Sequence, residues 1–294
     1  MNACIEVRFG PLGRCRHDEP SAHGATMHGI DTVVLGRSGS VALHEVRCSE
    51  TSRAAGEEEE EPAFSIAVPT AGVFVHHGEG RSTVGAPGLA LFMNPGDVHR
   101  TAHPEARGDR TIELALSEGA AEPFTRAATG AFSRRVARVP AALDVEVRLL
   151  ARAAGHGDLT ALELDERAHG VVAGLLGHPP MGSLAARQRA TVDAALEYLA
   201  WHFAEDADLP TVAATVGTSP HHLSRLFHAG TGITLSGFRT ELRVRAALER
   251  IANGAPDLSA VACDVGFFDH AHMTRTFRRL LGDTPTQLRD DLAS

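Results

Sequence analysis

The stretch from Leu209 to Gly232 constrains the fold of this chain more than any other, because it contains two short helical patterns in succession. In the first pattern, apolar residues recur three and four positions apart, which places them on one face of a helix. Gly217 follows, where a helix end favours a residue that tolerates positive φ. Ser219 then provides an N-cap, and Pro220 takes the first helical position, where its missing N–H is not needed. The sequence predicts two short helices joined by a tight turn.

The second of these helices has two contrasting faces. Leu223, Leu226 and Phe227 repeat at helical spacing and form the face that packs. The polar face carries groups that donate and accept hydrogen bonds: His221, His222, Ser224, Arg225 and His228. A helix that packs by one face and presents such groups on the other suits the major groove of DNA. We therefore interpret the stretch as a helix-turn-helix unit.

The same pattern occurs a second time downstream. Its apolar residues are Leu258, Val261, Ala262 and Val265 in the first helix, and Met273, Phe277 and Leu280 in the second. Gly266 closes the first helix and Asp269 can cap the second. Arg275 occupies the place that Arg225 has in the first unit. One helical hairpin is a common motif, whereas two in tandem with matching glycine, cap and arginine positions are a specific signal.

Residues 190–290 closely resemble the DNA-binding domain of AraC-type transcription regulators. The first unit matches L-x-x-V-A-x-x-x-x-x-S-P-x-x-L-x-R-x-F, and the second matches V-A-x-x-x-G-F followed by Thr-Arg-Thr-Phe. Arg250 and Met273 depart from the family pattern, which has an apolar and an aromatic residue there. The resemblance implies that two reading helices enter successive major grooves of double-stranded promoter DNA. The implied contacts are His221, Ser224 and Arg225 in the first groove, and His270, His272 and Arg275 in the second.

The charge of the chain does not by itself indicate a nucleic-acid partner. The formal net charge is −9, and residues 183–294 contain 11 Arg and 13 acidic residues. DNA binding therefore requires the arginines to be gathered on one surface. The chain contains no Lys. Every fixed side-chain cation is an arginine, which suits bidentate recognition of guanine or phosphate.

Composition is that of an ordinary globular protein, with 43% hydrophobic and 22% charged residues in 294. No apolar run reaches the length of a membrane span and no leader pattern opens the sequence, so we expect a soluble, cytoplasmic protein without membrane contact. Cys4, Cys15, Cys48 and Cys263 lack C-x-x-C spacing. We expect reduced thiols rather than disulfides or a zinc site, and no cofactor.

The N-terminal half has the pattern of short strands between turn residues. The predicted strands are Thr32–Leu35, Val41–Cys48, Phe64–Val68, Val73–Val75 and Leu89–Met93. Pro69 favours two short strands over one long strand, and we interpret the acidic run Glu57–Glu61 as a solvated loop. Asn94–Asp97 is a strong turn signal, with His99 just after it.

A glycine, a strand and then Pro-Gly-x-x-His resemble the second signature of cupin-type β-barrels, a fold that AraC-type sensor domains often have. We therefore predict an α+β protein, with a cupin-like barrel joined to an all-α domain. A metal-binding cupin also needs His-x-His followed by Glu, whereas His76 and His77 are adjacent, so we expect no metal. The candidate ligand-binding residues are His99, Arg100, His103 and Arg110, with a surface role equally open.

Three segments follow from these patterns. Residues 1–139 form the barrel with an N-terminal arm, whose Cys15, His17, His23 and His28 we interpret as incidental. Residues 140–182 are helical and either mediate dimerisation or cover the barrel, ending in the linker Gly177–Ser183. Residues 183–294 form the DNA-binding domain, where we expect the only tryptophan, Trp201, to pack against the first helix-turn-helix unit.

The predicted function is a sequence-specific, DNA-binding transcription regulator and not an enzyme. Its expected partners are promoter DNA, RNA polymerase if it is an activator, a small-molecule effector and a second copy of the chain. The alternatives are a cupin-type enzyme and a protein-binding scaffold with a helical appendage. Stoichiometric metal would favour the enzyme, and salt-dependent, sequence-selective DNA binding would exclude the scaffold.

Overall fold

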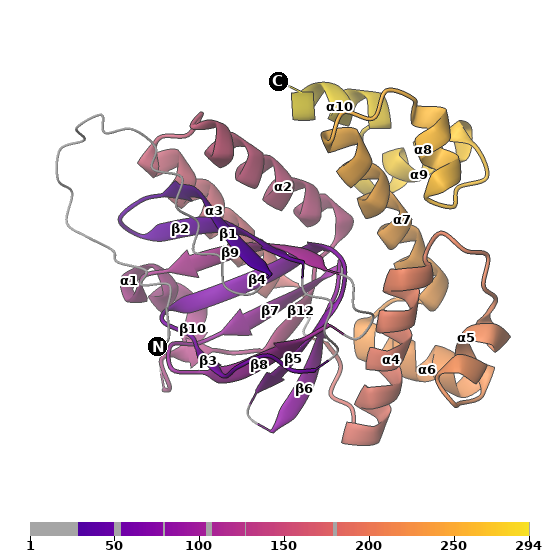
Figure 1. The fold of residues 1–294 in the computed structure, drawn as a ribbon, viewed down its shortest axis with the longest axis horizontal. Helices are drawn as coiled ribbons and strands as arrows, with labels where there is room; N and C mark the ends of the chain where they lie inside the picture. Colours follow the sequence, from indigo (N-terminus) through magenta and orange to yellow (C-terminus); the bar gives the residue numbers. More distant parts are fainter. Residues whose placement is uncertain are drawn as a thin grey trace.

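The computed structural model describes residues 29–49, 54–78, 80–103, 108–126, 128–178 and 181–293. A strand-rich N-terminal part is followed by an all-helical C-terminal part (Figure 1), which confirms the predicted α+β class. The expectations for the N-terminal arm fall outside the described residues. The strands are β1 Ile30–Arg37, β2 Val41–Cys48, β3 Glu59–Glu60, β4 Phe64–Ala71, β5 Phe74–Gly78, β6 Arg81–Gly85, β7 Leu89–Met93, β8 Val98–Ala102, β9 Asp109–Leu116, β10 Thr125–Arg126, β11 Ala131–Phe132 and β12 Val136–Arg138.

Two antiparallel sheets build the N-terminal part. The first has strand order β1-β2-β9-β4-β7-β12, and the second has order β3-β8-β5-β6. The structure confirms two strands rather than one in this region, although β4 continues through Pro69 to Ala71, beyond the predicted end at Val68. The register shifts between Pro69 and Ala71, and the chain turns at Gly72, whose φ of 75° favours glycine. A bulge thus accommodates the proline, and the glycine sets the strand end.

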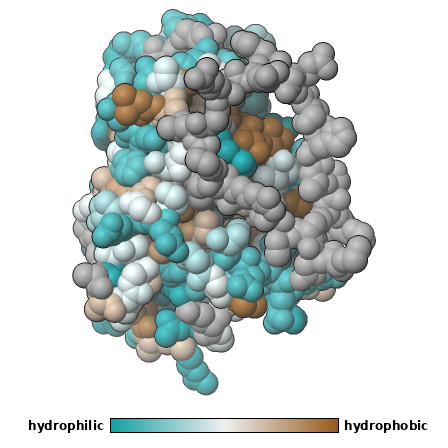
Figure 2. All heavy atoms as spheres, turned by 90° about the vertical axis from the view of Figure 1, so that its left-hand side faces the viewer, coloured by the Kyte–Doolittle hydropathy of each residue, from teal (hydrophilic) through white to brown (hydrophobic). Residues whose placement is uncertain are grey.

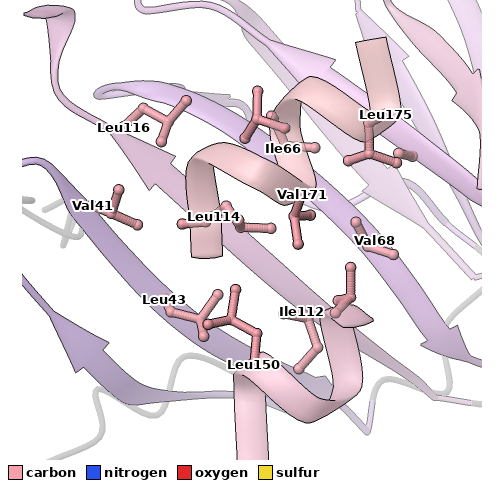
Figure 3. Packing of buried hydrophobic residues seen from close by; sticks show 14 of the residues in the cluster. Val41, Leu43, Ile66, Val68, Ile112, Leu114, Leu116, Leu150, Val171 and Leu175 are labelled. Carbon is pink, nitrogen blue, oxygen red and sulfur yellow. The ribbon is translucent and has the colours of Figure 1, made fainter. Parts of the chain in front are cut away.

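Helices α2 (Ala141–His156) and α3 (Ala161–Gly177) cover one face of the six-stranded sheet. Figure 3 shows Ile66, Ile112 and Leu114 of the strands directed at Leu150 of α2 and Val171 of α3. Side chains alternate along a strand, so the residues between these apolar positions point to the opposite face, toward the second sheet. Two short helices, α1 (Glu118–Ala121) and the 3₁₀ helix η1 (Glu122–Phe124), follow β9.

The C-terminal part consists of α4 (Ala186–His202), α5 (Leu209–Thr215), α6 (Pro220–Thr231), α7 (Leu235–Ala252), α8 (Leu258–Asp264), α9 (His270–Leu281) and α10 (Pro285–Ala293). The predicted apolar faces of both helix-turn-helix units are buried, including Val212 and Phe227 in one unit and Val261 and Phe277 in the other. Each unit has its own hydrophobic cluster, and α7 contributes residues to both. The two units are therefore held by one shared helix.

The two parts of the chain are joined by buried ion pairs as well as by apolar contacts. Asp144 of α2 lies 2.7 Å from Nε of Arg148 and 3.6 Å from Nε of Arg245 on α7. Arg245 also donates to the carbonyl of Val139, and Arg148 pairs with Glu249 of α7. Glu241, Arg138 and Arg110 also form pairs at this junction. We call the charged residues of this group the interdomain ion cluster: Arg110, Arg138, Asp144, Arg148, Glu241, Arg245 and Glu249.

Trp201 lies on this junction too. It packs against Val73, Val84 and Ala86 of the strand region, so the expectation that it packs against the first helix-turn-helix unit is wrong. The reason is that α4 turns the side that carries Trp201 toward β6.

On the face shown in Figure 2, described hydrophobic residues form separate patches among hydrophilic ones. Within the described residues, no helix combines the length and apolarity that crossing a membrane demands.

Candidate functional site

Helix α6 places the predicted polar residues of the first unit at the surface. Ser219 is the N-cap, and its hydroxyl accepts a hydrogen bond from the backbone N–H of His222 at 3.3 Å. His221 and Arg225 are exposed and Ser224 is half-buried. The helix ends at Gly232, whose φ is 78°. Leu223 and Phe227 are fully buried on the other face, so packing fixes the direction in which the polar face points.

Helix α9 repeats this construction. The Asp269 carboxylate caps it by accepting from the backbone N–H of His272 at 2.6 Å, and Gly282 ends it with a φ of 86°. Arg275 is exposed, as Arg225 is in α6, and both arginines lie six positions after their cap. His270 and His272 are half-buried. The His272 ring lies edge-on to Phe267 at 5.3 Å and accepts from the N–H of Phe268, which reduces its freedom to reach outward.

Helix α7 connects the two helix-turn-helix units. It has 18 residues, which corresponds to about 27 Å at 1.5 Å per residue. Its buried residues include Phe238 in the cluster of the first unit and Leu248 in the cluster of the second. Successive major grooves on one face of B-DNA are about 34 Å apart. A rigid helix of this length is therefore of the scale required to hold two readers one helical turn apart.

Phe268 is a surface residue that reasoning from the sequence missed. It is 87% exposed, the most exposed of the large hydrophobic residues described, and it directly precedes the Asp269 cap of α9. Phe267 beside it is buried in the core of the second unit. An exposed phenylalanine at the start of a reading helix can contact the methyl group of thymine. The signal in the sequence was the second of two adjacent phenylalanines, of which the helix-turn-helix pattern uses only the first.

A group of polar side chains lies between the two sheets. Ser65 donates to the carboxylates of Glu61 at 3.0 Å and Glu113 at 3.1 Å. His99 lies 3.9 Å from Glu61 and stacks on His76 with ring centroids 4.4 Å apart. Glu61 is only 9% exposed, so the interpretation of the whole acidic run as a solvated loop is wrong for this residue. The acidic run ends at the second sheet, where β3 begins. Side chains alternate in direction along β3 and the residue after it, so the side chain of Glu61 points into the space between the two sheets.

Burial disfavours the charged forms of the side chains in this interior group. Burial, followed by repulsion from Glu113, raises the pKa of Glu61 to about 8, and burial raises the pKa of Glu113. Burial lowers the pKa of His76 to about 4, and that of His99 is lowered for the same reason. Among the described residues, Nε2 of His76 and Nδ1 of His99 have no hydrogen-bond partner. The interior therefore offers unused hydrogen-bonding capacity at two imidazole nitrogens.

A cleft of about 950 Å³ runs from this interior toward α4. Its strand-side wall includes His76, Leu91 and Met93, and its helix-side wall includes Arg189 and Asp193 of α4. Burial raises the pKa of Asp193 to about 6. The volume falls within the usual range for small-molecule sites, about 300–1,000 Å³. A molecule in the cleft would contact both the sheet region and the first helix of the C-terminal part.

The four candidate ligand-binding residues are not gathered at one place. His99 faces the interior group, whereas Arg100 is exposed and lies 3.2 Å from Glu58. Nε2 of His103 donates to the Asp109 carboxylate at 2.7 Å, and Arg110 pairs with Glu45 and with Glu249 of α7. None of the four lines the described cleft. A ligand contact by these residues stays a prediction.

Comparisons with known proteins agree on the C-terminal part. A family model described as a helix-turn-helix domain matches residues 212–291. The arabinose operon regulatory protein of Escherichia coli K12 is 29% identical over 227 residues, covering 72% of this chain and 75% of that protein. The HTH-type transcriptional regulator GlxA of Rhizobium meliloti is 34% identical over 116 residues, 38% of this chain and 35% of that protein. ToxT from Vibrio cholerae aligns with 87% of this chain and 100% of its own at 9% identity, with a TM-score of 0.36, too low to support an argument.

Proposed function

We propose that this chain, an AraC-type transcription regulator with a cupin-like N-terminal domain, reads two successive major grooves of promoter DNA with α6 and α9. The observation that carries this proposal is the matched pair of reading helices on one connecting helix. Both begin at a side-chain cap, end at a left-handed glycine and expose an arginine at the same position. A protein that only bound another protein would have no need for two such matched units on one connecting helix.

The proposed contacts are His221, Ser224 and Arg225 in one groove, and His270, His272 and Arg275 in the other. The exposure of Arg225 and Arg275 supports direct contact with base edges or phosphates. We assign no catalytic role to the chain and place its action in the cytoplasm, where promoter DNA is found. A homodimer and a contact with RNA polymerase also belong to the proposal. The exposed Leu162 on α3 is a described apolar residue that a second copy could cover.

The effector site in this proposal is the cleft between the strand region and α4. Behind it, Glu61 and His76 of the interior group are uncharged near neutral pH, as pKa values of about 8 and about 4 indicate. This chemistry suits a small molecule with several hydroxyl groups, one of which can satisfy Nε2 of His76, while Arg189 and Asp193 on the opposite wall can bind others. Because α4 forms one wall, a bound molecule changes the contacts between the sensor and the DNA-binding domain.

The arginine pair tests the DNA-reading proposal. Selection from random DNA duplexes first identifies the preferred site of the full chain. If Arg225 binds a guanine edge bidentately, Arg225→Ala weakens binding to that site by about 1–3 kcal/mol and relaxes preference at one position. Arg275→Ala does the same in the other half-site, about one helical turn away. If the arginines hold phosphates instead, binding to all sequences falls together and the salt slope decreases by about one per arginine.

Arg47→Ala is the matched control, since Arg47 is an exposed arginine on β2, outside both helix-turn-helix units. This variant should bind as the wild type does. Native circular dichroism with unchanged affinity and selectivity in both Arg225→Ala and Arg275→Ala would refute the two-groove proposal.

A further inference from the structure

Three metal-ligating side chains meet at one end of the strand region, away from the cleft and from the reading helices. Cys48 is the last residue of β2, His103 directly follows β8, and Asp109 is the first residue of β9. Cys48 and Asp109 are paired neighbours in the β2–β9 ladder. The fold therefore brings together residues 61 positions apart in the sequence, which no local spacing motif would reveal.

The distances in this cluster are close to those of a coordinated ion. Sγ of Cys48 lies 3.9 Å from Nδ1 of His103, and one ligand atom from each of the three residues lies within 4.8 Å of the others. Tetrahedral zinc, with bonds of about 2.0–2.3 Å, places its ligand atoms about 3.3–3.6 Å apart. At present Nδ1 of His103 faces the thiol and Nε2 donates to Asp109 at 2.7 Å, so the imidazole must rotate away from Asp109 before one nitrogen can share an ion with both other groups.

Burial and charge also fit a divalent ion. Cys48 and His103 are buried, at 8% and 4% exposure. A thiolate and a carboxylate together neutralise a 2+ ion bound with a neutral imidazole, so the site would carry no uncompensated buried charge. Thr111 donates to the second carboxylate oxygen of Asp109 at 3.0 Å, the kind of outer contact that orients a metal ligand. Three protein ligands leave a fourth position for water.

We propose that Cys48, His103 and Asp109 form a binding site for a divalent transition metal, with zinc the best match to a sulfur, nitrogen and oxygen ligand set. The site is separate from the cupin pattern, in which His76 and His99 would have been the candidate ligands. It also lies beside the junction between the two parts of the chain, because Arg110, the next residue after Asp109, pairs with Glu249 of α7. A metal here would fix the start of β9, where Arg110 forms its ion pair with α7.

The test uses the full chain, freed of metal with a chelator and titrated with Co²⁺ in the absence of thiol reductants. A tetrahedral site with one thiolate gives sulfur-to-cobalt charge-transfer absorption in the near ultraviolet and ligand-field bands in the visible. We expect one equivalent of Co²⁺ to produce both, and Zn²⁺ to displace it. Cys48→Ser should abolish the charge-transfer band. Asp109→Asn should weaken binding at least about 100-fold, since the loss of outer-shell groups alone costs 10–100-fold.

Cys263→Ser is the matched control, because Cys263 is exposed on α8 and is not part of the cluster. It should bind Co²⁺ as the wild type does. If Cys48→Ser loses its native circular dichroism, the test relies on Asp109→Asn and His103→Gln, provided that each of them keeps a native circular dichroism spectrum. The proposal is overturned if the wild type shows no cobalt–thiolate absorption, or if the spectrum and affinity persist in these variants. In the latter case the histidine is a structural ion-pair partner of Asp109 only. DNA binding is measured separately, so failure here leaves the proposed regulator function untouched.

Discussion

The interdomain ion cluster makes a strong prediction about stability, and Asp144 is the residue to change. It is fully buried on α2 and lies between two buried arginines, Arg148 on its own helix and Arg245 on α7. Replacing Asp144 by alanine removes the carboxylate and leaves both guanidinium groups buried. Buried charges that lose a partner are costly, whereas exposed pairs contribute little.

The magnitude follows from what each arginine keeps. Removing one partner of a buried pair typically costs about 3–5 kcal/mol. Arg245 still has Glu241 at 3.2 Å and the carbonyl of Val139, and Arg148 still has Glu249 and the carbonyl of Thr70 at 3.1 Å. These remaining partners place the expected loss at the lower end, about 3 kcal/mol. Since the pairs are buried, moderate salt should change this loss only slightly.

Urea unfolding at 25 °C measures the effect, followed by far-ultraviolet circular dichroism and by the fluorescence of Trp201, the only tryptophan, on α4. The two signals should change together in the wild type and separate in Asp144→Ala, because the pairs that join α2 to α7 are weakened. Glu146→Ala is the control: Glu146 is exposed on the same helix, and its loss should stay within about 0.5 kcal/mol. A loss for Asp144→Ala no larger than that of the control would refute the reasoning.

Three further predictions concern the interior group, the cleft and Phe268. The pKa of Glu61 is raised to about 8, so the stability that this group contributes is present at acid pH and is lost as pH rises through 8. Glu61→Gln should therefore gain stability relative to the wild type between pH 5 and pH 9, by on the order of a few kcal/mol at about 1.4 kcal/mol per pKa unit. A urea midpoint difference that is equal at both pH values would contradict this. Neutral polyols should raise the melting temperature of the full chain more than organic acids of similar size do. His76→Leu should remove that shift. If polyols still stabilise the variant, the ligand binds elsewhere. Phe268→Ala should reduce affinity by about tenfold for a selected DNA site that contains thymine near the α9 contact. Replacing that thymine by uracil should weaken DNA binding by the wild type but not by the variant. Equal effects of uracil on both proteins would exclude a contact with the methyl group.

The C-terminal part was predictable because its determinants are local. The Ser219 and Asp269 caps, the glycines that end each helix and the apolar residues three and four apart act within one or two turns of chain. The structure confirms the two helical hairpins at those places. The same locality explains the strands β2 and β7, whose predicted bounds coincide with the observed ones.

The sequence by itself determined the presence of the two helix-turn-helix units and the α+β order of the chain, because capping and periodicity are properties of neighbouring residues. Tertiary structure alone decided which titratable groups are buried, since Glu61 looks like any other member of an acidic run until a sheet covers it. It also decided that Trp201 packs on the strand region and that Asp144 meets Arg245. Cys48, His103 and Asp109 come together only because β2 and β8 end, and β9 begins, at the same side of the fold. Contacts between residues far apart in the chain depend on strand register and helix packing, which no short sequence pattern encodes.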